Sequence, residues 1–267
     1  MVGILAIGTE ITTGQILNTN SQWLSTQLLE LGIQTFYQMA VPDRPQEIKE
    51  ALVFLENHCT LLFVTGGLGP TADDFTRTIL AEKYQRPLVW NQENWERVQS
   101  KLNSRGVQIR TIHRQQCEFL EGSTILPNSA GTADGFVFKV SISRLDQQGE
   151  SEIEIYVLPG PPKEILSIWE GGVRERLSTV VPKPQKWIQK KWTTKGLPES
   201  EVASRVNEVL GEESQKVLYR AHTPFVDVKL LYQQKESEVN EAHGQKIIQA
   251  LGPWLCEPPE NKEPQNS

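Results

Sequence analysis

A glycine-rich segment followed by two adjacent acids points most directly to chemistry. It runs from Thr65 to Asp74 and reads Thr-Gly-Gly-Leu-Gly-Pro-Thr-Ala-Asp-Asp. Glycines let a backbone approach a ligand closely, and unpaired N–H groups at a helix start favour anionic oxygen. No Lys-Ser or Lys-Thr pair follows, so the segment is not a P-loop. It predicts a site for a phosphate-bearing small molecule.

The residues of this segment suggest two roles, metal binding with catalysis and phosphate binding. Asp73 and Asp74 are candidate metal ligands and catalytic residues, because carboxylates suit Mg²⁺, Mn²⁺ or Co²⁺. The alternative is a tight turn in which both acids complement the first turn of a helix, with Asp74 as a cap. The candidate phosphate-binding residues are Gly66, Gly67, Gly69 and Thr71.

A second polar loop begins at Gly8 and Thr9, which are candidate phosphate- or substrate-binding residues. Glu10 in this loop is a candidate metal ligand or general base, and the alternative is a solvated carboxylate. Asn18 and Asn20 are candidates for binding phosphate or ribose. Asn20 equally suits the N-cap of the helix that follows.

The elements that must position these loops alternate between strand and helix patterns. Three strands separated by two helices imply right-handed crossovers and a mostly parallel sheet covered on both faces. Ligands of such sheets bind beyond the carboxyl ends of the strands, where both candidate loops fall. The predicted strands are Val2–Ile7, Ile33–Val41 and Leu61–Val64, and the predicted helices lie around Trp23–Leu31, after Pro45 and from near Thr71.

Further along, two more strands are predicted at Gly135–Val140 and Glu152–Leu158, around a polar hairpin near Asp146–Gly149. A stiff loop, Pro159–Pro162, then precedes a helix. Lys163 after this loop is a candidate substrate-binding residue that closes the site, or it simply begins the helix.

The chain predicts two domains. A Gly-Gly pair at 171–172 and the Pro182/Pro184 stretch mark the boundary. We expect an α/β sandwich over 1–172, a small α+β domain over 183–256 and a disordered tail over 257–267. The smaller domain shows strand patterns at 187–194 and 225–232 and helix patterns at 199–210 and 238–251.

Composition limits the class of partner. The formal net charge is −6 without a concentrated Lys/Arg block, which argues against nucleic acid or a membrane surface and favours small solutes. Three widely spaced cysteines and four histidines show no disulfide or zinc pattern. No apolar run approaches ~18 residues and no signal-peptide pattern is present, so we expect a cytoplasmic protein.

Several motifs in order resemble the CinA family over about residues 1 to 172. They are Gly8-Thr9-Glu10-Ile11, Gly14-Gln15-Ile16, Asn18-Thr19-Asn20, the segment Thr65–Asp74, and Pro159-Gly160-Pro161-Pro162 with Glu164. Asn128 and Gly131–Ala133 also resemble a family segment, although Asp134 stands where proline is expected. The resemblance adds Asn128 and Gly160 to the candidate substrate-binding residues.

The resemblance implies a molybdopterin-binding-like α/β/α sandwich followed by a KH-like domain, the latter matched by Gly196 with Glu199-Ser200. It also implies a homodimer and divalent-metal-dependent hydrolysis of ADP-ribose to AMP and ribose 5-phosphate. The residues themselves leave the substrate open among ADP-ribose, FAD and other nucleotide diphosphates. The Gly-x-x-Gly loop of RNA-binding KH domains is not found in this KH-like segment, which argues against RNA as a partner.

Full-length CinA proteins continue into a domain that deamidates nicotinamide mononucleotide, and nothing in this sequence resembles that domain. We therefore expect no deamidase activity. Three alternatives stay open: a nucleotide- or molybdopterin-binding module without turnover, an adenylyltransferase of molybdopterin, and a truncated CinA that acts with a separate deamidase.

Overall fold

In the computed structural model, the described residues are 1–71, 73–144, 150–180 and 187–257. The chain divides into two compact units, Met1–Pro184 and Gln185–Ser267. The first unit continues past Gly172 through a further helix. The hairpin expected near Asp146–Gly149, the Pro182/Pro184 stretch and all but the first residue of the tail expected at 257–267 lie outside the described residues.

The first unit is built on a six-stranded sheet in the order β2-β1-β3-β8-β7-β6. The first four strands in this order run parallel, and β7 and β6 are antiparallel to their neighbours, so the predicted mostly parallel sheet is confirmed. The strands are β1 (Val2–Ile7), β2 (Thr35–Val41), β3 (Leu61–Thr65), β6 (Thr124–Leu126), β7 (Gly135–Ser143) and β8 (Glu150–Leu158).

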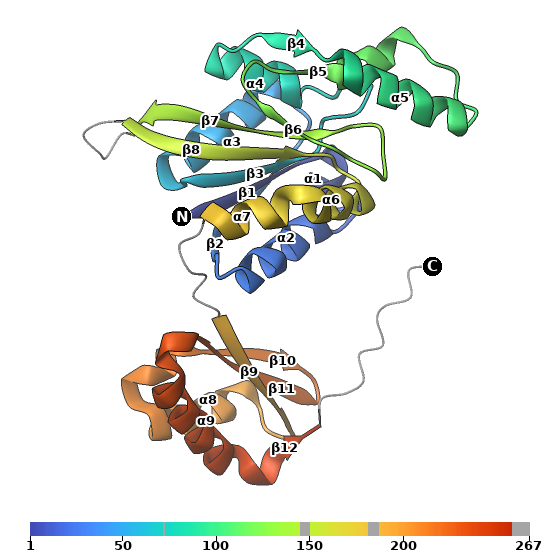
Figure 1. Ribbon diagram of the computed structural model, residues 1–267. Helices are drawn as coiled ribbons and strands as arrows, with labels where there is room; N and C mark the ends of the chain where they lie inside the picture. The colour runs from blue at the N-terminus through green and yellow to red at the C-terminus, as the bar shows by residue number, and fades with distance from the viewer. Residues whose placement is uncertain (72, 145–149, 181–186, 258–267) are drawn as a thin grey trace. The chain divides into compact units, whose positions relative to one another are not determined.

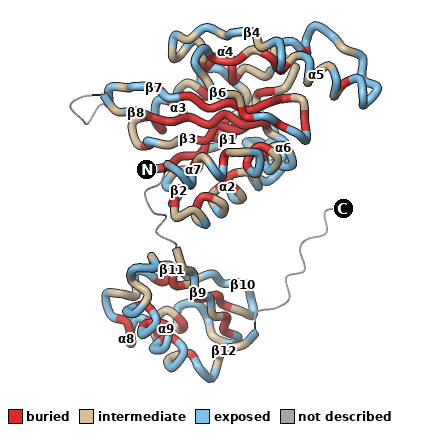
Figure 2. Tube along the Cα trace, viewed as in Figure 1, coloured by how far each residue is buried: buried red, intermediate tan, exposed pale blue. Residues whose placement is uncertain are grey.

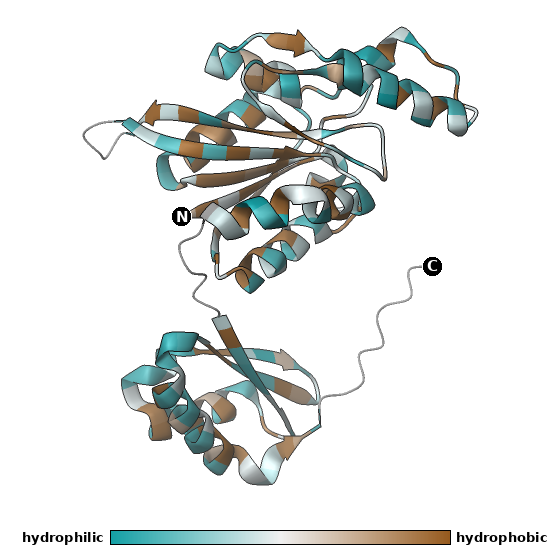
Figure 3. Ribbon diagram, viewed as in Figure 1, coloured by the Kyte–Doolittle hydropathy of each residue, from teal (hydrophilic) through white to brown (hydrophobic). Residues whose placement is uncertain are grey.

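Helices cover both faces of this sheet and make a three-layer sandwich (Figure 1). One face packs on α3 (Pro45–His58) and α4 (Thr76–Tyr84), where Leu52 and Leu80 are buried. The opposite face packs on α2 (Thr19–Glu30), α6 (Pro162–Ile168), the π-helical turn η2 (Trp169–Val173) and α7 (Arg174–Val180). Buried strands lie between helices whose outer faces are exposed and polar (Figures 2 and 3).

The strand order reverses at β1, because the chain reaches β2 on one side through α2 and β3 on the other side through α3. The helices that follow β1 and β3 are α2 and α4, which lie on opposite faces of the sheet, so the connections diverge at the carboxyl ends of these two strands. Such a switch point leaves a crevice that ligands occupy. A one-turn helix, α1 (Thr9–Thr12), follows β1 there.

A small lobe is inserted between α4 and β6, at the top of Figure 1. A two-stranded sheet pairs β4 (Leu88–Trp90) with β5 (Glu118–Leu120), joined through α5 (Gln92–Ser104) and the 3-10 helix η1 (Thr111–Cys117). Its own core contains Val98, Leu102 and Cys117. Neither of these strands was predicted from the sequence, because strands of three residues show too little alternation to be detected.

The second unit is an antiparallel sheet in the order β10-β11-β9-β12, packed on two helices. The predicted helix at 199–210 is confirmed, whereas β10 and β12 were not predicted. The elements are β9 (Trp187–Lys195), α8 (Glu199–Leu210), η3 (Gly211–Lys216), β10 (Val217–His222), β11 (Phe225–Gln233), η4 (Gln234–Glu236), α9 (Ser237–Leu251), η5 (Gly252–Trp254) and β12 (Leu255–Cys256). Within the described ranges, no helix has the length and apolarity needed to cross a membrane.

Candidate functional site

Two adjoining hollows open at the carboxyl ends of β1, β3 and β8. The acidic pocket, of about 380 Å³, is lined by residues 66–71, which we call the glycine loop, and by five carboxylates: Glu10, Asp43, Asp73, Asp74 and Glu164. The side pocket, of about 300 Å³, is lined by residues that include Asn18, Asn20 and Leu17. Glu10 and Gly160 line both hollows, so the loops after β1 and β3 converge as expected.

The glycine loop is pressed against the end of β1. Gly66 has a φ of +97°, and a Cβ on it would lie 2.1 Å from the carbonyl oxygen of Ile7. Gly67 has a φ of +64°, and its Cβ would lie 2.2 Å from Oγ1 of Thr76. Only glycine fits this conformation at these distances. The Gly66 N–H donates to the carbonyl of Leu158 at 3.1 Å, so this donor is already paired within the fold.

Asp74 fills the centre of the glycine loop. Its carboxylate accepts from the N–H of Gly69 at 2.7 Å, from the N–H of Thr71 at 2.8 Å and from the Thr71 hydroxyl at 2.6 Å. The predicted helix start near Thr71 is wrong, since α4 begins at Thr76. The reason is that Thr71 donates to Asp74 instead of accepting from a helical N–H. The donors of the glycine loop therefore already bind one anion, the carboxylate of Asp74.

Two other carboxylates of the acidic pocket, Asp73 and Glu10, are more exposed than Asp74. Asp73 is exposed, and a hydrogen bond with Thr71 keeps the pKa of its carboxyl below the usual value. Glu10 is exposed beside Gly8, whose added Cβ would lie 2.9 Å from Oε1 of Glu10. Asp73 and Glu10 are therefore the two predicted acids that solvent and a ligand reach most freely.

Asp43 lines the acidic pocket but was missed from the sequence. It accepts from the N–H of Thr9 at 2.6 Å, and its own N–H donates to the Thr9 hydroxyl at 3.1 Å. Thr9 therefore positions the loop after β1 against Asp43. The detectable signal was an acid two residues after Val41, the end of a predicted parallel strand.

The two asparagines of the side pocket have different roles. Oδ1 of Asn18 accepts from the N–H of Ser21 at 3.1 Å and caps α2. The interpretation of Asn20 as this cap is wrong, because Asn20 lies inside the first turn. Its Nδ2 instead donates to the carbonyl of Gly160 at 2.7 Å and joins α2 to the proline-rich loop.

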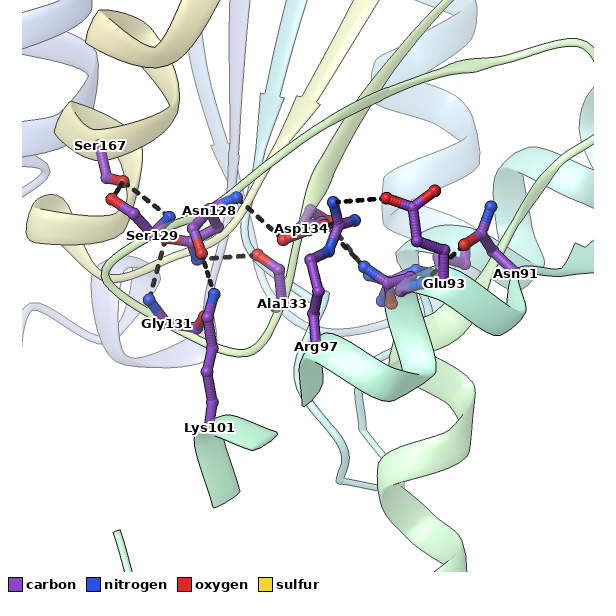
Figure 4. A network of polar contacts seen from close by, with 12 residues as sticks. Asn91, Glu93, Arg97, Lys101, Asn128, Ser129, Gly131, Ala133, Asp134 and Ser167 are labelled. Carbon is purple, nitrogen blue, oxygen red and sulfur yellow. Dashed lines mark hydrogen bonds and ion pairs between the residues drawn. The ribbon is translucent and has the colours of Figure 1, made fainter. Parts of the chain in front are cut away.

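Asn128 organises residues 128–134, which we call the asparagine loop (Figure 4). Its side chain is buried, accepts from the N–H groups of Ala130 and Gly131, and donates to Oε2 of Glu164 at 2.6 Å. Asn128 lines neither hollow, so the structure places it behind the site and not at the ligand surface. Lys163 is exposed and likewise lines neither hollow.

Glu164 is a partly buried acid of the acidic pocket. Burial raises the pKa of its carboxyl, while the bond from Asn128 and the charges of Arg105 and Lys101 act in the opposite direction. A partly buried carboxylate with a raised pKa in a cleft is a candidate proton acceptor.

Asp134 attaches the asparagine loop to α5 (Figure 4). This buried carboxylate accepts from Arg97 at 2.7 Å, from Nδ2 of Asn94 at 2.6 Å and from the N–H of Asn128 at 2.9 Å. Lys101 of α5 also donates to the carbonyl of Gly131 at 2.7 Å. The residue that departs from the expected proline thus makes a polar anchor that proline lacks.

Comparisons with known proteins agree with this fold. The family model described as "Probable molybdopterin binding domain" matches residues 3–179. A CinA-like protein of Dictyoglomus turgidum is 39% identical over 176 residues, covering 66% of this chain and 40% of that protein. The chain belongs to the CinA family.

A second relative extends this membership beyond the first unit. The CinA-like protein of Crocosphaera subtropica is 32% identical over 262 residues, covering 93% of this chain and 59% of that protein. The chain thus spans about half the length of the curated relatives it matches. The solved structure of CinA from Thermoplasma acidophilum, 23% identical with a TM-score of 0.55, covers 65% of this chain and 97% of that chain, and supports the fold alone.

In this CinA-family chain, the acidic pocket suits a divalent metal ion that is bound jointly by protein carboxylates and by the phosphates of a substrate. No Lys, Arg or His is found among the described residues lining the pocket. Residues 1–71, 73–144, 150–180 and 187–257 also contain no group of three His, Cys, Asp or Glu side chains close enough to hold an ion on their own. Mg²⁺ is often bound by one or two carboxylates together with substrate phosphates and water. The oxygen donors fit that mode and do not form a closed cage.

Proposed function

We propose that this CinA-family chain hydrolyses the pyrophosphate bond of a nucleoside-diphosphate sugar with the help of Mg²⁺, Mn²⁺ or Co²⁺. ADP-ribose is the first candidate, with AMP and ribose 5-phosphate as products. One observation carries the proposal: the glycine loop lies in a pocket lined by five carboxylates and by no described cationic side chain. A pyrophosphate is repelled by such a lining unless a cation accompanies it.

The protein groups divide the work of binding. The N–H groups of Gly67 and Leu68 donate to no described residue, which leaves them for a phosphate oxygen. Asp73 and Glu10 are assigned to the divalent ion. Asp74 can join them only if its carboxylate gives up the hydrogen bonds from the N–H groups of Gly69 and Thr71. The ion, when bound, neutralises charge on the two phosphoryl groups.

Glu164 is assigned as the proton acceptor for the attacking water. Asn128 fixes its Oε2, so the other oxygen is left to face the pocket that Glu164 lines. The water oxygen bonds to one phosphorus as the bond from that phosphorus to the bridging oxygen breaks. The proton of the water passes to Glu164, and the bridging oxygen leaves with the second phosphate.

A binding module without turnover is the second candidate, and Asp74 favours it. Its carboxylate already occupies two N–H groups of the glycine loop, so a ligand phosphate has to displace it or use the remaining donors. A nucleotide or a molybdopterin held in this way need not be cleaved. The expected homodimer and the separate deamidase stay predictions.

Chromatographic product analysis separates the two candidates. Purified protein is incubated with ADP-ribose, with and without Mg²⁺, Mn²⁺ or Co²⁺, beside Asp73→Ala and the control Glu30→Ala at an exposed position that lines neither hollow. Hydrolysis predicts metal-dependent AMP release that Asp73→Ala abolishes and Glu30→Ala preserves. Binding of ADP-ribose without AMP release favours the module. Deamidation of nicotinamide mononucleotide contradicts our expectation about that activity.

A further inference from the structure

Two neighbouring apolar residues are exposed at the side pocket. Ile16 and Leu17, in the loop between α1 and α2, are 52% and 84% exposed, and both line this hollow. An exposed apolar patch at a hollow is one of the features that mark a ligand-binding groove. Because solvent reaches both residues, a molecule in the hollow can contact them without any change in the fold.

The lining of the side pocket differs from that of the acidic pocket. Among the described residues that line it, Glu10 alone is charged, and the other polar residues are asparagines and threonines. Its volume of about 300 Å³ lies at the lower end of the range for small-molecule sites. A flat heteroaromatic ring suits such a lining, because its faces are apolar and its edge carries hydrogen-bonding nitrogens. The apolar lining residues are Ile7, Ile11, Ile16, Leu17, Pro161 and Pro162.

The two hollows adjoin closely enough for one molecule to occupy both. Ile7, Glu10, Gly160 and Pro161 line the side pocket and the acidic pocket alike. The carbonyl of Glu10 also accepts from the N–H of Ile16 at 3.2 Å, which attaches the exposed apolar pair to a residue assigned to the divalent ion. A ligand whose pyrophosphate lies in the acidic pocket can therefore place an adjoining group in the side pocket.

We propose that the side pocket binds the base of the nucleoside diphosphate, with Ile16 and Leu17 packed against the ring, and so selects nucleotides over phosphates without a base. The base is the part of a nucleoside-diphosphate sugar that has apolar faces, since its sugars carry hydroxyl groups. The ligand class rests on the proposed function, but binding of the base does not require turnover. Binding and hydrolysis therefore test the two separately.

Isothermal titration calorimetry in Mg²⁺ tests the proposal with ADP, ribose 5-phosphate and inorganic pyrophosphate as probes, of which ADP alone carries a base. Leu17→Gln replaces the apolar side chain with a polar one of similar length. We expect about tenfold weaker binding of ADP and unchanged binding of the other two probes. Leu17→Met stays apolar and should bind ADP within about twofold of the unsubstituted protein. Because Leu17 is exposed, neither variant should move the melting temperature by more than about 2 °C.

Leu166→Gln is the matched control, because Leu166 is also an exposed leucine of the first unit, at 47%, but lines neither hollow. It makes the same chemical change away from the site and should leave all three affinities unchanged. A loss of ADP binding confined to Leu17→Gln supports a contact with the base.

Three outcomes overturn the proposal. They are undiminished ADP binding by Leu17→Gln, an equal loss for pyrophosphate, and ADP binding by the unsubstituted protein that is no tighter than that of ribose 5-phosphate. Undiminished ADP binding together with a smaller oligomer in solution assigns the apolar pair to an interface between copies of this chain instead. Leu17-dependent binding of ADP without AMP release from ADP-ribose contradicts the proposed hydrolysis and supports the role of the side pocket.

Discussion

The glycine loop and the asparagine loop lie at the same site but are held in different ways. The glycine loop is fixed by its own backbone, by close approach to β1 and by Asp74 from the same segment. The asparagine loop is fixed by side chains from elsewhere, with Arg97 and Lys101 from α5 on one side and Glu164 from α6 on the other. The first loop is therefore held mainly by its own segment and by backbone contacts with β1 and β8, and the second by side chains from α5 and α6.

This difference has a functional consequence. The loop that is fixed locally supplies N–H groups, which need only a correct backbone. The loop that is fixed by packing sets the position and the pKa of Glu164, which depend on a buried partner and on nearby charges. We therefore expect substitutions in the glycine loop to act mainly on the stability of the strand ends. Substitutions around the asparagine loop should also change the reactivity of Glu164.

Gly66→Ala should have the largest effect, because it breaks the locally fixed loop. The new Cβ meets the Ile7 carbonyl at 2.1 Å in a left-handed conformation, so we expect a loss of at least about 3 kcal/mol of unfolding free energy. Urea denaturation measures this. Gly14→Ala is the control, since Gly14 has a φ of +76° but no neighbouring atom within 4 Å, and should cost about 1 kcal/mol. Equal losses at the two positions contradict the close-approach argument.

Asp134→Ala should break the loop held by packing. It leaves Asn94 and the N–H of Asn128 without their buried acceptor, so we expect a loss of about 3 kcal/mol. Hydrogen exchange should accelerate in the asparagine loop but not at the glycine loop. Glu93→Ala is the control, because Glu93 is 82% exposed and contacts Arg97 at 3.7 Å, and should cost no more than about 0.5 kcal/mol. Uniform acceleration in both loops speaks against independent support.

Glu164→Gln tests whether the asparagine loop positions a reactive group. Removing a general base should lower the rate of AMP release by about 100-fold. A base acts only when deprotonated, so the wild-type rate should rise with pH through a pKa above the usual glutamate range. Lys101 and Arg105 lower this pKa and Asp134 raises it, while burial dominates. The pH profile of Glu164→Gln should lack that rise, and an unchanged profile removes Glu164 from the reaction.

Gln115→Ala should have the smallest effect, because it removes a contact that joins the small lobe to the glycine loop. Its Nε2 bonds to two carbonyls of that loop, so we expect a loss of about 1 kcal/mol in thermal unfolding. Gln46→Ala is the control, because it removes an exposed hydrogen bond from Gln46 to Glu50. It should lower the free energy of unfolding by only about 0.3 kcal/mol. If Gln115→Ala costs no more than this control, the glycine loop needs no support from η1.

Much of the fold follows from local pattern. The apolar runs of β1 and β3 and the 3.6-residue periodicity of α3 predict the parallel sheet, because these elements bury whole faces. Pro45 correctly marked the start of a helix. The small lobe escaped prediction because β4 and β5 have three residues each and become stable only by pairing with one another.

Less of the site follows from sequence. The glycine loop, Glu10 and Asp73 were identified from residue types at strand ends. Short-range rules failed at Thr71 and Asn20, because several capping patterns compete within a few residues and tertiary contacts decide among them. The anchor at Asp134 joins residues about 40 positions apart, and the partners lie on elements that no periodicity links.

The central claim is that a cation must accompany the ligand into a pocket with five carboxylates and no described cationic lining. Titration calorimetry of ADP-ribose, with Mg²⁺ and then with a chelator, tests it directly. We predict that binding weakens by at least about 100-fold without the ion and that Asp73→Ala removes most of the difference. Equally tight binding in the chelator would contradict the account.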